Sequence, residues 1–192
     1  MRIDVRIDKS GLEKAYKALQ RIPGAFPQAV SSAMNRTLES MRTESARETA
    51  GRYFAKSGEV KKTLQLRTAN AGNLYGAMIS RGGRKKLQEY KLTPKNPQAG
   101  NKKGFKGAVM RKGGLKPLPK GTFMMNTPNA GNVLFRRIRP GKAWSNIEHV
   151  VSPSIPQIVK NKETVAVVEK RAREVFEKRL NHEVMRIIGA MV

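Results

Sequence analysis

The chain has 192 residues, of which 39 are Lys or Arg and 14 are Asp or Glu, so its formal net charge is +25 at pH 7. It contains no cysteine, which excludes disulfides, thiolate catalysis and cysteine-ligated zinc. The start of the chain lacks the apolar core of a signal peptide, and no stretch is apolar for long enough to cross a membrane. We therefore expect one soluble domain over residues 1–192, made in the cytoplasm, whose charge faces an anionic partner.

The first third of the chain predicts a strand followed by helices. Residues 2–8 alternate Ile and Val with Arg and Asp, a period of two that is typical of a half-buried strand. Ser10 and Glu13 have the spacing of a capping box, and the helix that follows should end at Pro23–Gly24. A second helix is expected from Pro27 to Gly51, and a short one from Ser57 to Lys62.

The remainder predicts short strands and one long helix. Alternating segments bounded by Gly and Pro indicate strands at 64–68, 74–80, 86–92, 107–110, 122–126 and 132–138. From Lys162 to Ile188 apolar residues recur every three or four positions, which predicts an amphipathic helix. The expected fold class is α+β: a small, mainly antiparallel sheet packed by N-terminal helices and a long C-terminal helix.

The middle of the chain is the most basic part. Between Arg81 and Lys120 there are thirteen Lys or Arg and a single acid, Glu89, which gives this segment a charge of +12. Residues 82–120 are rich in Gly and Pro and poor in large apolar groups, so we expect an extended basic loop or arm that becomes ordered against a neighbour. Its expected contacts with DNA or a partner are Arg84, Lys85, Lys86, Lys102, Lys103, Lys106, Arg111 and Lys112.

Such contact would be electrostatic, weakened by salt and indifferent to base sequence. The excess of cations continues at Arg136, Arg137, Arg139 and Lys142, beside Trp144. The chain shows no helix-turn-helix, zinc finger or pair of stacking aromatics for reading bases, and Trp144 is interpreted as a packing residue. The anionic surface is therefore either a phosphate backbone or an acidic protein.

Enzymatic chemistry is not indicated. His149 and His182 lie in different expected elements without the spacing of metal ligands, so neither a metal nor another cofactor is predicted. Glu148 and His149 are neighbours in an expected strand and should point to opposite faces. No glycine-rich phosphate loop is present. A nuclease would need clustered carboxylates, which the acid-poor middle does not offer, so no catalytic residue is predicted.

The order of the elements resembles a known family. The residues that carry the resemblance are Ile22–Pro23, Ala29, Ala33, Asn35–Arg36, Gly121–Phe123, Val133–Arg137, Val150–Gln157 and the closing basic helix. Together they resemble the minor tail protein Z family of lambda-like phages and prophages, and more loosely the tail-completion proteins of long-tailed phages. The segment from Lys85 to Lys120 matches least, so its expected role comes from its charge.

The resemblance implies a structural α+β subunit that forms a ring, expected to be a hexamer, at the head-proximal end of the tail. Such proteins complete the tail, join it to the head and lie where the DNA end enters, so the implied partners are tail-tube, terminator and head-connector proteins and the genomic DNA end. The implied location is the virion, after assembly in the host cytoplasm. The alternative is a monomeric, sequence-neutral nucleic-acid-binding protein of an architectural or ribosome-associated type. The sequence leaves open whether the arm faces DNA or protein.

Overall fold

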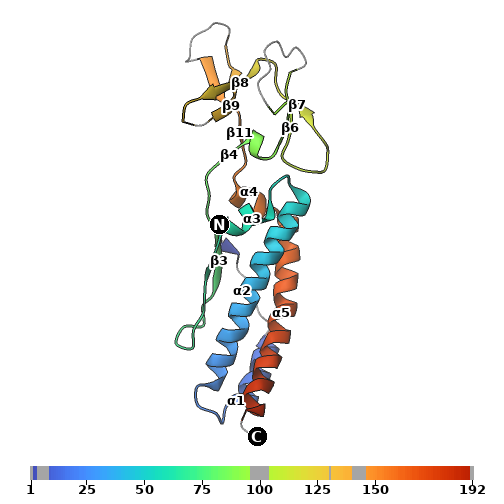
Figure 1. The fold of residues 1–192 in the computed structure, drawn as a ribbon. Helices are drawn as coiled ribbons and strands as arrows, with labels where there is room; N and C mark the ends of the chain where they lie inside the picture. Colours follow the sequence, from blue (N-terminus) through green and yellow to red (C-terminus); the bar gives the residue numbers. More distant parts are fainter. Residues whose placement is uncertain (1, 4–8, 96–103, 130, 140–145, 191–192) are drawn as a thin grey trace.

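The computed structural model describes residues 2–3, 9–95, 104–129, 131–139 and 146–190. Figure 1 shows an elongated molecule in which two long helices lie side by side and small β-sheets gather at one end. The part that carries these sheets, comprising the described residues between 84 and 152, is called the β-rich end below.

Two helices of 28 residues, each about 42 Å long at 1.5 Å per residue, form the body of the molecule. α2 (Ala25–Arg52) and α5 (Lys162–Gly189) run antiparallel along each other, and both confirm the helices expected from the sequence. Every fourth residue of α2 from 25 to 49 is buried, and most of these are Ala, Ser or Thr. These short side chains let α5 approach closely enough to bury Phe176 and Leu180 against α2.

Three shorter helices complete the helical part. α1 (Lys9–Leu19) already includes Ser10 in its first turn, so the expected role of Ser10 as the residue before the helix is wrong. Gly24, whose positive φ of 73° suits a residue without Cβ, turns the chain into α2. The expected short helix is confirmed as α3 (Ser57–Thr63), whereas α4 (Ile155–Val159) was not expected. No described helix is long and apolar enough to span a membrane.

The strands of the described residues form several small antiparallel sheets. β1 (Arg2–Ile3), β2 (Leu64–Arg67) and β3 (Ala77–Ser80) form one in the order β1-β3-β2, beside α2. β4 (Lys85–Lys86) pairs with β11 (Val151–Ser152). β5 (Lys91–Thr93), β6 (Lys106–Ala108) and β7 (Lys116–Pro117) form a third sheet, and β8 (Thr122–Thr127), β9 (Gly131–Arg137) and β10 (Ile147–His149) form a fourth.

The α+β class is therefore confirmed, with its strands divided among small sheets. Most of the expected strands are shifted by one or two residues, and two differ more. The strand expected at 86–92 is interrupted by a 3₁₀ turn at Leu87–Glu89, and β3 begins three residues later than expected. Of the strand expected at 2–8, residues 4–8 lie outside the described part of the chain.

Apolar side chains gather in three clusters along the molecule. One lies where α1 meets the first half of α2 and the second half of α5, and a second joins the other halves of these long helices to α3, α4, β2 and β3. The third belongs to the β-rich end and contains Leu87, Leu92, Phe105 and Leu134. Phe105 is 8% exposed, so the described part of the expected arm has apolar packing of its own within the chain.

Candidate interface at the basic end

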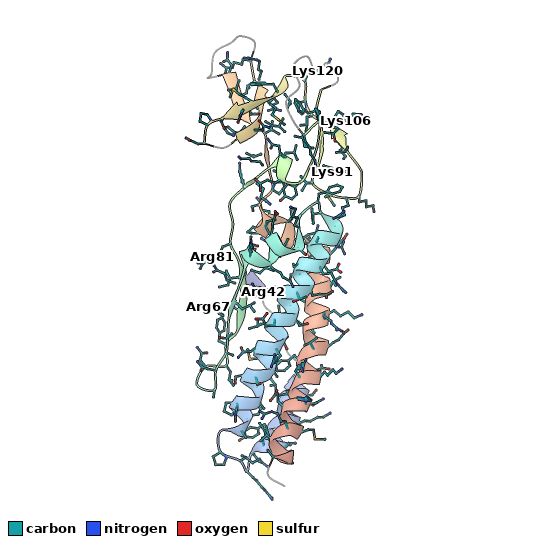
Figure 2. The ribbon with its side chains drawn as sticks, in the orientation of Figure 1. Arg42, Arg67, Arg81, Lys91, Lys106 and Lys120 are labelled. Carbon is teal, nitrogen blue, oxygen red and sulfur yellow. The ribbon has the colours of Figure 1, made fainter. Side chains whose placement is uncertain are left out.

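The β-rich end contains no described carboxylate over most of its length. No Asp or Glu stands between Glu89 and Glu148, whereas thirteen Lys and Arg do. Figure 2 shows Lys91, Lys106 and Lys120 on this end, and Arg42, Arg67 and Arg81 farther along the molecule. Because the stretch has no acids of its own, most of its cations must remain in water or meet an anion from elsewhere in the chain or from another molecule.

Several cations of this end, among them Arg84, Lys106, Lys112, Lys116 and Lys120, are exposed and form no ion pair with any described residue. Arg84 precedes β4, Lys106 lies in β6, and Lys112 lies in the turn that leads to β7. Lys116 lies in β7 and Lys120 precedes β8. Arg84, Lys106 and Lys112 are among the contacts expected from the sequence. Lys116 and Lys120 were counted in the charge of the segment but were not among its expected contacts. The sequence shows only that they are cations, whereas the structure shows that their side chains are exposed.

Lys85 differs from these five because it already has partners within the chain. Its Nζ lies 2.7 Å from Glu59 Oε2, 3.1 Å from Glu89 Oε2 and 5.7 Å from the ring centre of Tyr90. Burial on its own would lower the pKa of Lys85, but the hydrogen bonds to Glu59 and Glu89 outweigh it and hold the pKa above the ordinary 10.5. With its side chain only 14% exposed, Lys85 links β4 to α3.

Arg111 also has a structural role. The backbone N–H of Arg111 donates to the carbonyl of Arg52 over 2.8 Å, and the N–H of Phe54 donates to Val109 over 2.9 Å. The Nε of Arg111 donates to the carbonyl of Ala50 over 2.8 Å, in the last turn of α2, where carbonyls lack partners within the helix and a cation is favourable. Arg111 thus fastens the β-rich end to the end of α2.

Two cations contact the ring of Phe54 at this junction. The guanidinium of Arg111 lies 4.9 Å from the ring centre of Phe54, and Lys91 Nζ lies 4.8 Å from the same centre. Such cation–π contacts orient both side chains. Lys91 was not expected as a site residue, and no sequence pattern could have revealed its contact with a ring at the end of a distant helix.

The other expected contacts are less exposed or lie outside the description. Lys86 belongs to β4, is half-buried and pairs through its backbone with Val151. Lys102 and Lys103 lie outside the described residues, as do Lys142 and Trp144. The structure therefore brings Arg84, Lys85 and Lys86 together in and beside β4, and places Lys106, Arg111 and Lys112 in and after β6.

The sheet β8–β9–β10 carries aromatic rings among its cations. The rings of Phe123 and Phe135 stack with centres 5.9 Å apart, and Arg137 lies 5.3 Å over Phe123. Glu148 forms an ion pair with Arg136 across the strands, whereas the ring of His149 packs edge-on against Phe135. Glu148 and His149 thus have separate partners, as the alternation of a strand predicts.

No feature of the described residues forms a metal centre. No group of three or more His, Asp or Glu in this part of the chain is placed to hold a metal ion. What the exposed cations can do chemically is bind anions such as phosphates or carboxylates, with a strength that falls as salt rises.

Comparison with known proteins gives one match. A family model described as prophage minor tail protein Z matches residues 9–190, which is nearly the whole chain. Searches of curated proteins and of solved structures found no match.

Proposed function

Because the chain belongs to the prophage minor tail protein Z family, and so is a structural component of a phage tail, we propose that it forms a ring at the head-proximal end of that tail. In this role it completes the tail, joins it to the head and contacts the end of the genomic DNA. The family match supports a structural function in the virion tail, and the finer assignment rests on charge and shape.

The observation that carries the proposal is the basic β-rich end of an elongated subunit, in which no Asp or Glu stands between Glu89 and Glu148. Copies of a chain with a net charge of +25 repel one another when they assemble. At physiological salt this repulsion acts over about 8 Å, the screening length. The repulsion is strongest between the basic β-rich ends of neighbouring subunits. If the ring directs these ends toward one polyanion, the negative charge of that polyanion offsets the repulsion between them.

Five side chains are proposed to make that contact: Arg84, Lys106, Lys112, Lys116 and Lys120. They are exposed, and no described carboxylate pairs with them. Lys85 and Arg111 are assigned to holding the β-rich end in place, because their partners lie within the chain. Contact with DNA would involve phosphates and would not read base sequence.

The role in the tail is tested by electron microscopy of particles from a parent phage whose gene carries a stop codon. Overlong or headless tails, or joined particles that do not infect, are the expected defects. Overlong tails would indicate a role in terminating the tail. Headless tails, or joined particles that do not infect, would indicate a role in completing it. Normal infectious virions would overturn the assignment and favour a sequence-neutral nucleic-acid-binding protein instead.

The role of the five cations is tested by replacing all five with Ser. The matched control replaces five exposed cations of the helical part that have no ion-pair partner among the described residues: Lys14, Lys17, Arg21, Lys62 and Lys160. The first variant should keep the helical circular dichroism spectrum yet fail to restore infectivity to the stop-codon phage, whereas the control should restore it. Equal infectivity of the two variants, or unfolding of the first alone, would contradict this division of roles.

A further inference from the structure

A second cationic site lies between the two long helices, outside the β-rich end. α2 and α5 line an open groove of about 450 Å³. Its polar lining consists of Arg36 and Ser40 from α2 and Arg171, Lys178, Arg179 and His182 from α5. None of these residues was expected to form a site, because the first and last long helices meet only in the folded chain.

The charges of this groove are not balanced by its own lining. Four of the lining side chains are cations, and no carboxylate lines the groove. Arg171 Nη1 lies 3.3 Å from Glu174, while Arg36, Lys178 and Arg179 form no ion pair with described residues. Like charges in one groove repel, so an anion bound there would stabilise the helix pair.

The chain itself has few carboxylates to offer. Nine of its twelve glutamates form ion pairs within the same chain: 39, 44, 48, 59, 89, 148, 163, 174 and 183. A second copy of the chain would therefore bring mainly engaged glutamates to the groove. Because most glutamates of the chain are already paired, an anion from a different kind of molecule fits the groove better than a second copy of the chain.

The lining favours a phosphate backbone over an acidic protein segment. Val175 is the one apolar residue of the lining, whereas protein interfaces are centred on buried apolar and aromatic side chains. Arginine forks match phosphate oxygens, and phosphate contacts come from Arg, Lys and Ser in wet interfaces. Arg171 and His182 are eleven residues apart, so the lining of α5 extends over about 16 Å, or roughly five phosphates of one duplex strand.

We propose that this groove binds the phosphodiester backbone of a DNA duplex. The inference stands on the groove alone and does not depend on the β-rich end, so either site can fail without the other.

The two histidines of the chain make the sites distinguishable in one experiment. His182 lines the groove, and His149 lies in β10 at the β-rich end. NMR spectra of the ring protons of the full chain are recorded while a 16-base-pair duplex is added, and in parallel with a hexaglutamate peptide. The test variant carries Arg36→Gln with Arg179→Gln. The control carries Lys170→Gln with Arg173→Gln, which changes two cations outside the groove lining.

We expect the chemical shifts of the His182 ring protons to change when the duplex is added. This change should be lost in the test variant and kept in the control. The slope of log affinity against log salt should become shallower by about 1.8 in the test variant, at about 0.9 for each lost phosphate contact. A shift of His182 with hexaglutamate alone would overturn phosphate as the ligand and favour an acidic protein. A shift of His149 alone would overturn the groove while leaving DNA contact at the β-rich end. No shift at either histidine would overturn both.

Discussion

Replacing Phe176 by Ala tests whether helices α1, α2 and α5 form one packed core. Phe176 is 2% exposed and belongs to the cluster that contains Ala15, Ala29 and Ala33. Removing a buried phenyl ring costs about 3–5 kcal/mol through lost burial and the cavity that remains. The upper part of this range is expected, because alanines around the site cannot extend into the void. For a chain of this size such a loss corresponds to a melting temperature lower by about 8–20 °C.

The assay is urea unfolding followed by circular dichroism of the helices, with Met185→Ala as the control on the same helix. Met185 is 72% exposed, so its truncation should change the free energy of unfolding by less than about 0.5 kcal/mol. The urea midpoint of Phe176→Ala should fall while the slope with urea stays the same. A loss below about 1 kcal/mol would refute the packing argument, since α1, α2 and α5 would then not depend on this contact.

Substitutions at three other positions test single links in the fold by the same assay. Asn35→Ala should cost about 2–3 kcal/mol, because the Asn35 amide donates to the Ala69 carbonyl over 2.9 Å and accepts from its N–H over 2.8 Å, and both backbone groups would lose a partner. Ser154→Ala should cost about 1 kcal/mol and Ser154→Gly only about a few tenths, because Ser154 caps α4 together with Gln157; equal costs would contradict a capping role. Lys85→Met should cost about 1–2 kcal/mol at pH 7. Since the folded pKa of Lys85 is raised above 10.5, the difference between wild type and variant should be constant from pH 7 to about 10.5 and shrink as pH rises through the folded pKa. A difference that persists at high pH would contradict the assignment to its ion pairs.

The helical part could be predicted because its signals are local. α2 and α5 repeat their apolar residues at helical spacing, and Pro27 in α2 and the cap Asn161 of α5 lie within two residues of their starts. α4 was missed because five residues are too few to show a period, although Ser154 and Gln157 have the spacing of a capping box. That spacing is the signal that could have identified it.

The β-rich end could be predicted only in part because its order depends on distant partners. Phe105 stands alone among glycines and lysines, and its burial requires Leu134, which belongs to another sheet. For the site, counting charges identified the basic end but could not separate Lys85, held by Glu59, from exposed Lys106. The groove between α2 and α5 could not be predicted from the sequence, because Arg36 and Arg179 are far apart in the chain and become neighbours only when the helices pair.

The pairing of β4 with β11 makes the β-rich end an insertion with adjacent boundaries. Lys85 lies opposite Ser152 and Lys86 opposite Val151, so the chain leaves the helical part and returns to it at the same place. Segments whose ends lie close together can be lengthened, shortened or exchanged without separating the elements on either side. The β-rich end can therefore change in length without displacing the helical part, because both of its boundaries are held by the pairing of β4 with β11.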